Sequence, residues 1–175
     1  TVTFTLPLLR PFSIALIYSE MQSLTDKPMK KLEFTKEIKA PAEKVWDTLW
    51  NETTYPQWTN AFNPNGSSIV ESDWQVGGRT LFLDGNGNGM VSTIKSKNEP
   101  HEMVFEHLGE IIDGKEDTTS ERVKSWAGAL EEYYLSESNG VTTLKASVQT
   151  GEEWAEMMSN GFTKGLEVVK NLSEQ

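Results

Sequence analysis

The alternation of apolar and polar residues predicts strands along most of the chain. Leu32, Phe34 and Ile38 alternate with polar residues, the period-two pattern of a strand with one buried face. Between residues 67 and 150, short alternating or apolar runs are separated by Gly, Asn and Pro, as in an antiparallel meander. Six further strands are predicted at residues 67–73, 79–83, 90–96, 102–112, 128–136 and 141–150. The charged residues 113–124 predict a mobile loop at a rim of the sheet.

Apolar residues follow helical spacing in three segments. Pro41 suits the first position of a helix over residues 42–50, and residues 51–58 predict a second short helical segment. A long helix is predicted over residues 152–173. Its inward stripe is expected to contain Trp154, Met157, Met158, Gly161, Phe162, Gly165, Leu166, Val169 and Leu172. This order predicts the α+β helix-grip fold, a curved antiparallel sheet of about seven strands wrapped round a long C-terminal helix, with two short helices after the first strand.

Composition narrows the class of protein. The chain has 175 residues, 37% of them hydrophobic and six of them Trp, which suits one globular domain. Its 16 basic and 26 acidic residues give a net charge of −10, which disfavours nucleic acids and anionic membranes as partners. There is no cysteine, so disulfides, thiolate metal sites and cysteine nucleophiles are excluded. A reducing compartment is permitted, and the cytoplasm is the simplest location.

Residues 1–28 lack the alternation and the turn residues of the rest of the chain. Pro7, Arg10 and Pro11 interrupt their apolar stretch, so no run approaches the ~20 residues of a membrane-spanning helix. No basic stretch precedes the apolar part, and no clear signal-peptide cleavage site precedes Met29. We therefore interpret residues 1–28 as a non-native or disordered extension, with translation starting at Met29 or alternatively at Met21. Residues 29–175 then form the domain.

Three segments of the domain resemble one known family. Residues 38–46 (IKAPAEKVW) are similar to its opening motif, residues 75–79 (QVGGR) to its glycine pair, and residues 128–135 with 140–144 to its last hairpin. The segments occur in the family's order and at its spacing. On these motifs, residues 29–175 resemble the heat-shock-protein ATPase activator-homologue branch of the START-like (SRPBCC) superfamily.

The resemblance leaves three functions open, because the superfamily includes lipid and hormone carriers, polyketide cyclases and chaperone activators. The first hypothesis is noncatalytic binding of a small apolar or amphipathic molecule, such as a lipid, in a cavity between sheet and C-terminal helix. The second, implied by the resemblance alone, is a co-chaperone-like activator whose partner is a heat-shock ATPase. The third is an enzyme of the cyclase or hydrolase type that uses the same cavity. The first is favoured, because no catalytic constellation and no cofactor motif is recognised.

Strand parity and the helical stripe select residues expected to line this cavity. Tyrosine and tryptophan combine apolar area with one polar tip, which suits the orientation of a ligand. Methionine repacks easily round different shapes, although ordinary core is the alternative for each Met. The predicted cavity-lining residues are Lys36, Trp50, Tyr55, Trp58, Phe82, Met90, Phe105, His107, Trp126, Tyr134, Trp154, Met158 and Phe162.

Two features of this region have competing interpretations. Lys36 shares a strand face with Phe34 and Ile38, so it could pair with a ligand carboxylate, or it could lie near a rim and meet water or a glutamate. Gly161 and Gly165 each cost about 1 kcal/mol relative to alanine inside a helix. Their missing side chains could open volume for a ligand, or allow close packing against the helix over residues 42–50.

The two histidines give neither a catalytic motif nor a metal site. His101 lies in a turn, His107 shares a strand face with Phe105, and neither has a recognisable partner. His107 could be a general acid or base, and the alternative is a hydrogen-bonded structural histidine. Glu71, Glu106, Glu131 and Glu132 occur on strands, where a buried pair could do acid–base work, but alternation places most of them on the solvated face. No specific carboxylate is therefore predicted to be catalytic.

Overall fold

The computed structural model describes residues 29–63, 66 and 68–175; the predicted extension over residues 1–28 lies outside the described part. The strands are β1 (Lys30–Ile38), β2 (Ile69–Ser72), β3 (Arg79–Leu83), β4 (Gly89–Asn98), β5 (Glu102–Ile112), β6 (Lys115–Asp117), β7 (Leu130–Ser138) and β8 (Val141–Thr150). The helices are α2 (Ala42–Trp50), α3 (Tyr55–Thr59), α4 (Glu121–Lys124) and α5 (Ala155–Ser173), and a 3-10 turn, η1 (Glu152–Trp154), precedes α5. The predicted order of strand, two short helices, meander and long helix is confirmed.

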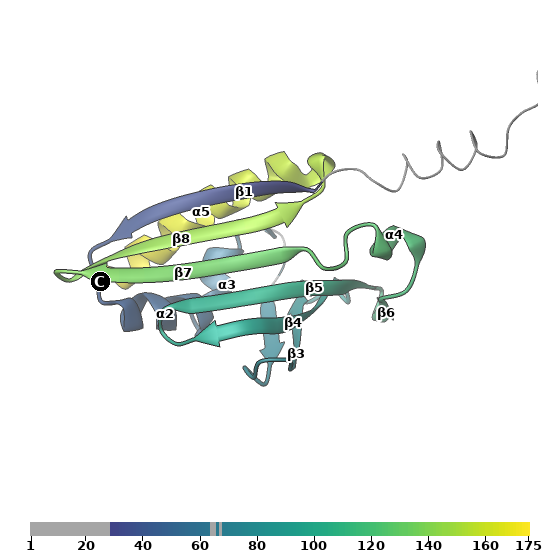
Figure 1. Ribbon diagram of the computed structural model, residues 1–175, viewed down its shortest axis with the longest axis horizontal. Helices are drawn as coiled ribbons and strands as arrows, with labels where there is room; N and C mark the ends of the chain where they lie inside the picture. The colour runs from purple at the N-terminus through teal and green to yellow at the C-terminus, as the bar shows by residue number, and fades with distance from the viewer. Residues whose placement is uncertain (1–28, 64–65, 67) are drawn as a thin grey trace, which may run out of the picture.

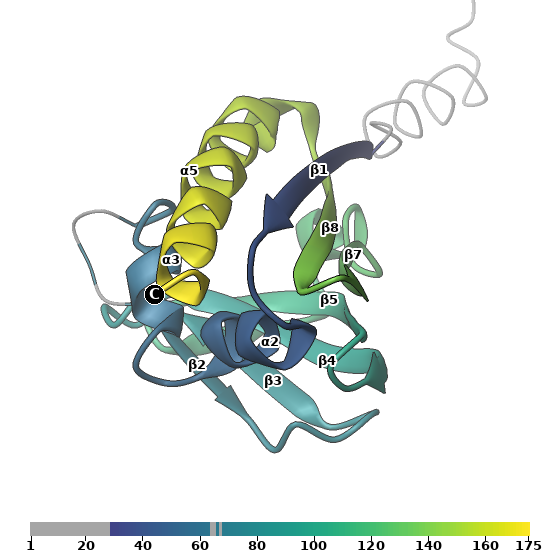
Figure 2. The same cartoon turned by 90° about the vertical axis from the view of Figure 1, so that its left-hand side faces the viewer.

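The described strands form one antiparallel sheet in the order β1-β8-β7-β5-β4-β3-β2, and β6 pairs with the end of β5 (Figure 1). The sheet has eight strands, where the sequence predicted about seven, because the short β6 was not foreseen. The strands bend round α5, so that one face of the sheet is concave (Figure 2). This confirms the helix-grip arrangement.

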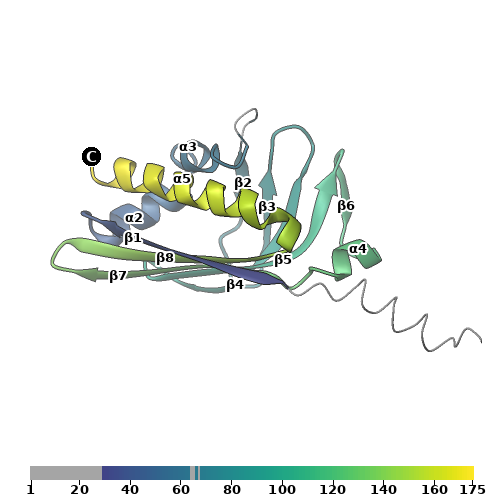
Figure 3. The same ribbon diagram turned by 90° about the horizontal axis from the view of Figure 1, so that it is seen from above.

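Helices α2, α3 and α5 lie on the same face of the sheet (Figure 3). In α5, Phe162, Leu166 and Val169 repeat at helical spacing and are almost completely buried. In α2, Val45 and Leu49 are fully buried on the side that packs into the same core. The core therefore lies between the concave face of the sheet and these three helices.

The predicted inward stripe of the C-terminal helix is wrong at its start. Trp154 is 56% exposed and Met157 is 46% exposed. Trp154 belongs to the η1 turn, where the backbone does not follow α-helical spacing, so counting back from Met158 gave it the wrong direction. The buried stripe begins one turn later than the sequence suggested.

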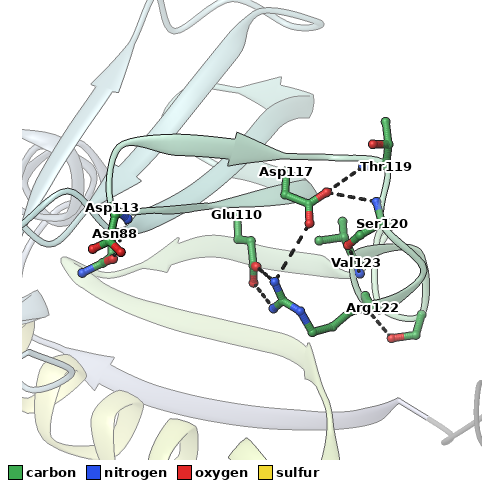
Figure 4. Close-up of polar contacts among 9 residues, drawn as sticks. Asn88, Glu110, Asp113, Asp117, Thr119, Ser120, Arg122 and Val123 are labelled. Carbon is green, nitrogen blue, oxygen red and sulfur yellow. Dashed lines mark hydrogen bonds and ion pairs between the residues drawn. The ribbon is translucent and has the colours of Figure 1, made fainter.

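Residues 113–124 form β6 and α4 in place of the predicted loop (Figure 4). The Asp117 carboxylate accepts a hydrogen bond from the Ser120 backbone N–H at 2.9 Å, and the Ser120 hydroxyl caps α4 by accepting from the Val123 N–H at 3.2 Å. Val123 is fully buried, and Arg122 forms a two-bond ion pair with Glu110 of β5. Local hydrogen bonds and one buried apolar side chain order this segment, which its low apolar content concealed.

Within residues 29–63, 66 and 68–175, no helix has both the length and the apolarity needed to cross a bilayer.

Candidate functional site

A cavity of about 260 Å³ lies between the N-terminal half of α5, α3 with the turn that follows it, and strands β3, β4, β5 and β7. Its wall is mostly aromatic and aliphatic, with a small number of polar groups. The lining residues are Tyr55, Trp58, Thr59, Phe62, Asn63, Ser68, Phe82, Leu83, Asp84, Gly89, Met90, His107, Glu131, Met157, Met158 and Phe162. We call this space the α5 cavity.

The apolar wall of the α5 cavity is built from aromatic rings packed edge to face. Phe62 meets Phe162 of α5 with ring centroids 5.1 Å apart, and Tyr55 meets Trp58 at 5.6 Å. On its other side Phe162 stacks on Phe34 of β1 at 4.9 Å. These contacts hold the rings in place, so the cavity is bounded by side chains that are already fixed.

The polar wall is a row of side chains in close contact, from Ser92 through His107 to Glu131 and Tyr133, which we call the polar chain. The Ser92 hydroxyl lies 2.8 Å from His107 Nδ1, and His107 Nε2 lies 3.2 Å from one Glu131 oxygen. The Tyr133 hydroxyl donates to the other oxygen of Glu131. The His107 side chain is 5% exposed and the Glu131 side chain 16% exposed, so these groups interact at low dielectric.

Strand register brings these four side chains together. Ser92 of β4 and His107 of β5 are direct cross-strand partners, beside a bulge between Val91 and Ser92. Glu131 of β7 lies opposite Phe105, two residues from His107 along β5. Successive residues of a strand face opposite sides, so Glu131 shares the concave face with Tyr133.

The two buried tyrosines keep their protons at neutral pH. Burial raises the pKa of Tyr133 well above its ordinary value, and the negative charge of Glu131 adds to that effect. Burial also raises the pKa of Tyr55, again with a contribution from Glu131. Tyr133 uses its O–H to hold Glu131, so the groups that line the cavity and can hold a polar group of a bound molecule are the Tyr55 phenol and the Glu131 carboxylate.

Seven of the thirteen predicted cavity-lining residues lie on the α5 cavity, while their contact with a ligand stays a prediction. They are Tyr55, Trp58, Phe82, Met90, His107, Met158 and Phe162. His107 has the partners that the sequence did not reveal, because they come from two other strands.

The other six predicted residues lie elsewhere. Trp50 and Phe105 are buried in the core, where their rings meet at 5.3 Å, and Trp50 also borders a second depression of about 280 Å³ next to Trp74. The Lys36 ammonium pairs with Glu167 of α5 at 2.8 Å, so its interpretation as a lysine that meets a glutamate is confirmed. Lys36 is thus paired with a glutamate of the protein itself and not with a ligand carboxylate.

Tyr134, Trp126 and Trp154 do not line the α5 cavity. Tyr134 is 42% exposed because its neighbour Tyr133, fully buried, holds the inward position on β7. Trp126 is partly buried in the turn after α4, and Trp154 is exposed in η1. Aromatic content alone did not show which way each ring points.

The glycines of α5 permit close packing, but against a different element from the one predicted. A Cβ added at Gly165 would lie 2.9 Å from the Trp58 carbonyl oxygen, and one at Gly161 would lie 2.3 Å from the Phe62 ring. Both neighbours belong to α3 and the turn after it, so the prediction of packing against residues 42–50 is wrong. The alternative in which the glycines open ligand volume is also wrong, because Phe62 and Trp58 already occupy those positions.

Sequence reasoning missed Ser92, Glu131, Tyr133, Phe62 and Asp84. Glu131 and Tyr133 lie two residues apart on β7 and therefore face the same side of the sheet. The sequence would have identified both if it had shown which of Tyr133 and Tyr134 is buried. Phe62 and Asp84 lie in turns, where no periodic pattern applies.

An antiparallel sheet closed round a C-terminal helix, with two short helices after the first strand and a cavity beside the long helix, defines a helix-grip protein of the START-like (SRPBCC) superfamily. Within it, the chain belongs to the family described as Activator of Hsp90 ATPase homolog 1-like protein, whose model matches residues 39–172. A search of curated proteins gives no match.

Solved structures agree on the fold. The Aha1 dimer from Colwellia psychrerythraea is 17% identical with a TM-score of 0.62, and the match covers 83% of this chain and 97% of that one. A protein from Chromobacterium violaceum is 15% identical with a TM-score of 0.61, over 83% and 99% of the two chains. CalU16 from Micromonospora echinospora is 15% identical with a TM-score of 0.55, over 84% and 75%. The family and the fold support a ligand-binding or co-chaperone-like domain.

Proposed function

We propose that the domain binds a small apolar or amphipathic molecule in the α5 cavity. The supporting observation is the space itself: about 260 Å³ stays open on the concave side of the sheet, although aromatic side chains fill the region beside it. A cavity with an apolar wall and a few converging polar groups is the usual form of a small-molecule site. Its lining would supply the apolar contacts, and the His107–Glu131 wall would orient the ligand.

Two measurements on the full chain test this function. Native mass spectrometry without detergent is expected to detect a retained small molecule, and thermal shift is expected to show stabilisation by one or more of fatty acids, flavonoids, aromatic polyketides and naphthalene derivatives. A ligand that binds the folded state at 100 times its Kd adds about 2.7 kcal/mol of stability. The proposal is refuted if no retained ligand is detected and none of these compounds stabilises the protein.

A pair of α5 variants connects binding to the cavity. Met158→Trp introduces a larger side chain at the lining, and it is expected to weaken binding about tenfold or more because the ligand and the indole compete for the same space. Asn160→Trp adds the same side chain at an exposed position of the same helix. If both variants bind equally well, the ligand lies outside the cavity.

The family match favours a second candidate, a co-chaperone-like activator of a heat-shock ATPase. Such an activator would act through its surface, where Val76 is 59% exposed and Ile69 44% exposed. A pull-down with the host's heat-shock ATPase and a turnover assay test it directly. Unchanged ATP turnover at saturating concentrations of the domain would exclude this role.

The close approach of His107 Nε2 to Glu131, at 3.2 Å, favours a third candidate, an enzyme of the cyclase or hydrolase type. The pair lies in a cavity wall, where a histidine or a carboxylate can transfer protons. Once a substrate is known, a His107→Ala variant is expected to lose activity, and unaltered activity would exclude this role for His107.

A cytoplasmic location is likewise a proposal, which cell fractionation would test.

A further inference from the structure

The charges in the α5 cavity have one sign. Its lining contains the carboxyl groups of Glu131 and Asp84, and no lysine or arginine occurs among the described residues that line it. Lys36, the lysine predicted to face inward, is engaged by Glu167 at 2.8 Å. A negatively charged ligand group would therefore meet carboxylates in the wall without a cation to pair with, which is costly at low dielectric.

Glu131 has a polar neighbour at each carboxylate oxygen. The Tyr133 hydroxyl donates to one, and His107 Nε2 lies 3.2 Å from the other. The orientation of the carboxylate is thus fixed before any ligand binds. Such preorganisation lowers the cost of forming a further charge-assisted hydrogen bond.

His107 lies between Glu131 and the interior of the sheet. Its Nδ1 lies 2.8 Å from the hydroxyl of Ser92, a residue that is 1% exposed, and its Nε2 lies 3.2 Å from one Glu131 oxygen. Both ring nitrogens of His107 thus face groups of the protein, whereas the Glu131 carboxylate lines the α5 cavity.

Aromatic faces surround the remainder of the cavity. Trp58, Phe62, Phe82 and Phe162 all line it. The face of an aromatic ring attracts a cation and also packs well against an apolar body. A carboxylate together with several rings is a suitable environment for an ammonium group attached to an apolar skeleton.

From these observations we propose that the ligand of the α5 cavity is an amphipathic amine, bound as its ammonium ion with an N–H donated to the Glu131 carboxylate and its apolar body against the rings of Trp58, Phe62 and Phe162. The inference rests on the proposed function, since it specifies the class of molecule that the same cavity takes. It also predicts that fatty acids and other carboxylates are poor ligands.

Three probes with one skeleton and different head groups test the inference. Binding of 2-naphthylmethylamine, 2-naphthylmethanol and 2-naphthoate to the full chain is measured by isothermal titration calorimetry at neutral pH. The amine is expected to bind about tenfold more tightly than the alcohol because it alone forms an ion pair with Glu131, and the carboxylate is expected to bind least. Naphthoate binding as tightly as the amine would overturn the inference.

Two adjacent glutamates of β7 supply a matched pair of variants. Glu131→Gln removes the inward charge with little change of shape, so the affinity for the amine is expected to fall about tenfold while that for the alcohol stays within about threefold. Glu132 faces the other side of the sheet, where it pairs with Lys31 at 2.9 Å, and Glu132→Gln is expected to keep the preference for the amine. Equal loss in both variants would contradict the assignment to Glu131.

The binding results distinguish failure of the amine proposal from failure of small-molecule binding itself. If all three probes bind equally, the cavity binds small molecules but does not select amines. If none binds and no other compound does, both proposals fail together. Circular dichroism tests whether each variant is folded. If Glu131→Gln is not folded, the relative affinities of the three probes for the unaltered protein decide whether the cavity prefers the amine.

Discussion

The concave side of the sheet has two regions that are packed differently. In the first, Trp50 contacts Phe105 at 5.3 Å and Tyr133 at 4.9 Å, so these rings pack directly on one another, and a depression of about 280 Å³ borders Trp50 on the side of Trp74. In the second, beside α5 and α3, the rings form a wall and leave about 260 Å³ open. The second region also differs in its wall, which includes the polar side chains of His107 and Glu131 beside the aromatic rings.

The two regions contribute differently to stability and to binding. The Trp50 region supplies buried apolar area and hence stability, whereas the α5 cavity gives up contacts that complete packing would have made. Substitutions in the first region should therefore change the free energy of unfolding most. Those in the second should change binding more.

The largest expected effect is that of Trp50→Ala. Removing a buried tryptophan from a packed aromatic cluster is expected to lower the free energy of unfolding by about 3–5 kcal/mol. Urea unfolding followed by circular dichroism measures it. Trp154→Ala, at a position 56% exposed, should stay within about 0.5 kcal/mol of the unaltered protein. A loss below about 1 kcal/mol for Trp50→Ala would mean that this region is not the main source of stability.

Ser92→Ala tests the buried end of the polar chain. It removes the hydroxyl 2.8 Å from His107 Nδ1, so a buried ring nitrogen is left without this partner at an expected cost of about 1–3 kcal/mol. Chemical denaturation gives the value, and Ser136→Ala, at an exposed position of β7, serves as the control. If the two variants are equally stable, the contact between Ser92 and His107 does not stabilise the fold.

Gly165→Ala tests how closely α5 packs on α3. The new methyl group would lie 2.9 Å from the Trp58 backbone oxygen, so overpacking is expected to exceed the gain in helix propensity and give a net loss of about 1–2 kcal/mol. At exposed Asn160, the change to alanine should instead stabilise the helix slightly. An increase in stability for Gly165→Ala would show that the two helices are not in tight contact.

The smallest effect is expected at the mouth of the cavity. A hydrogen bond from the Asn88 side chain, followed by those from the backbone of Asn86 and Asn88, holds the pKa of Asp84 below its ordinary value. A lowered pKa means that the stabilisation is present above the unfolded-state pKa and is lost as the pH falls through the folded-state value. Amide exchange of Asn86 and Asn88 should therefore be faster in Asp84→Asn than in the unaltered protein at neutral pH. The difference should shrink in acid, and a constant difference would argue against the charge of Asp84 as its cause.

The regular elements were predictable because their patterns are long. Period-two alternation in β1 and helical spacing in α5 each extend over many residues, and packing on the core follows the same periodicity. Prediction failed where a few hydrogen bonds decide the structure. The cap of α4 by Ser120 and the pairing of Lys115–Asp117 with β5 leave no periodic signal.

The candidate site was predictable only in part. Its α3 and α5 residues, such as Tyr55 and Phe162, follow from helix faces once the fold is known. The polar chain depends on register among β4, β5 and β7, and a shift of one residue would exchange Tyr133 for Tyr134. A single sequence does not determine that register, so the partners of His107 could be identified only from the three-dimensional structure.

The tight contact of Gly161 and Gly165 with α3 also bears on how a guest molecule would enter. Because α5 cannot separate from Trp58 without carrying that neighbour along, we expect the two helices to move as one body and not as a hinged flap. A guest would then enter through the part of the cavity that is already open to solvent, where Met157 is 46% exposed, and no partial unfolding would be needed.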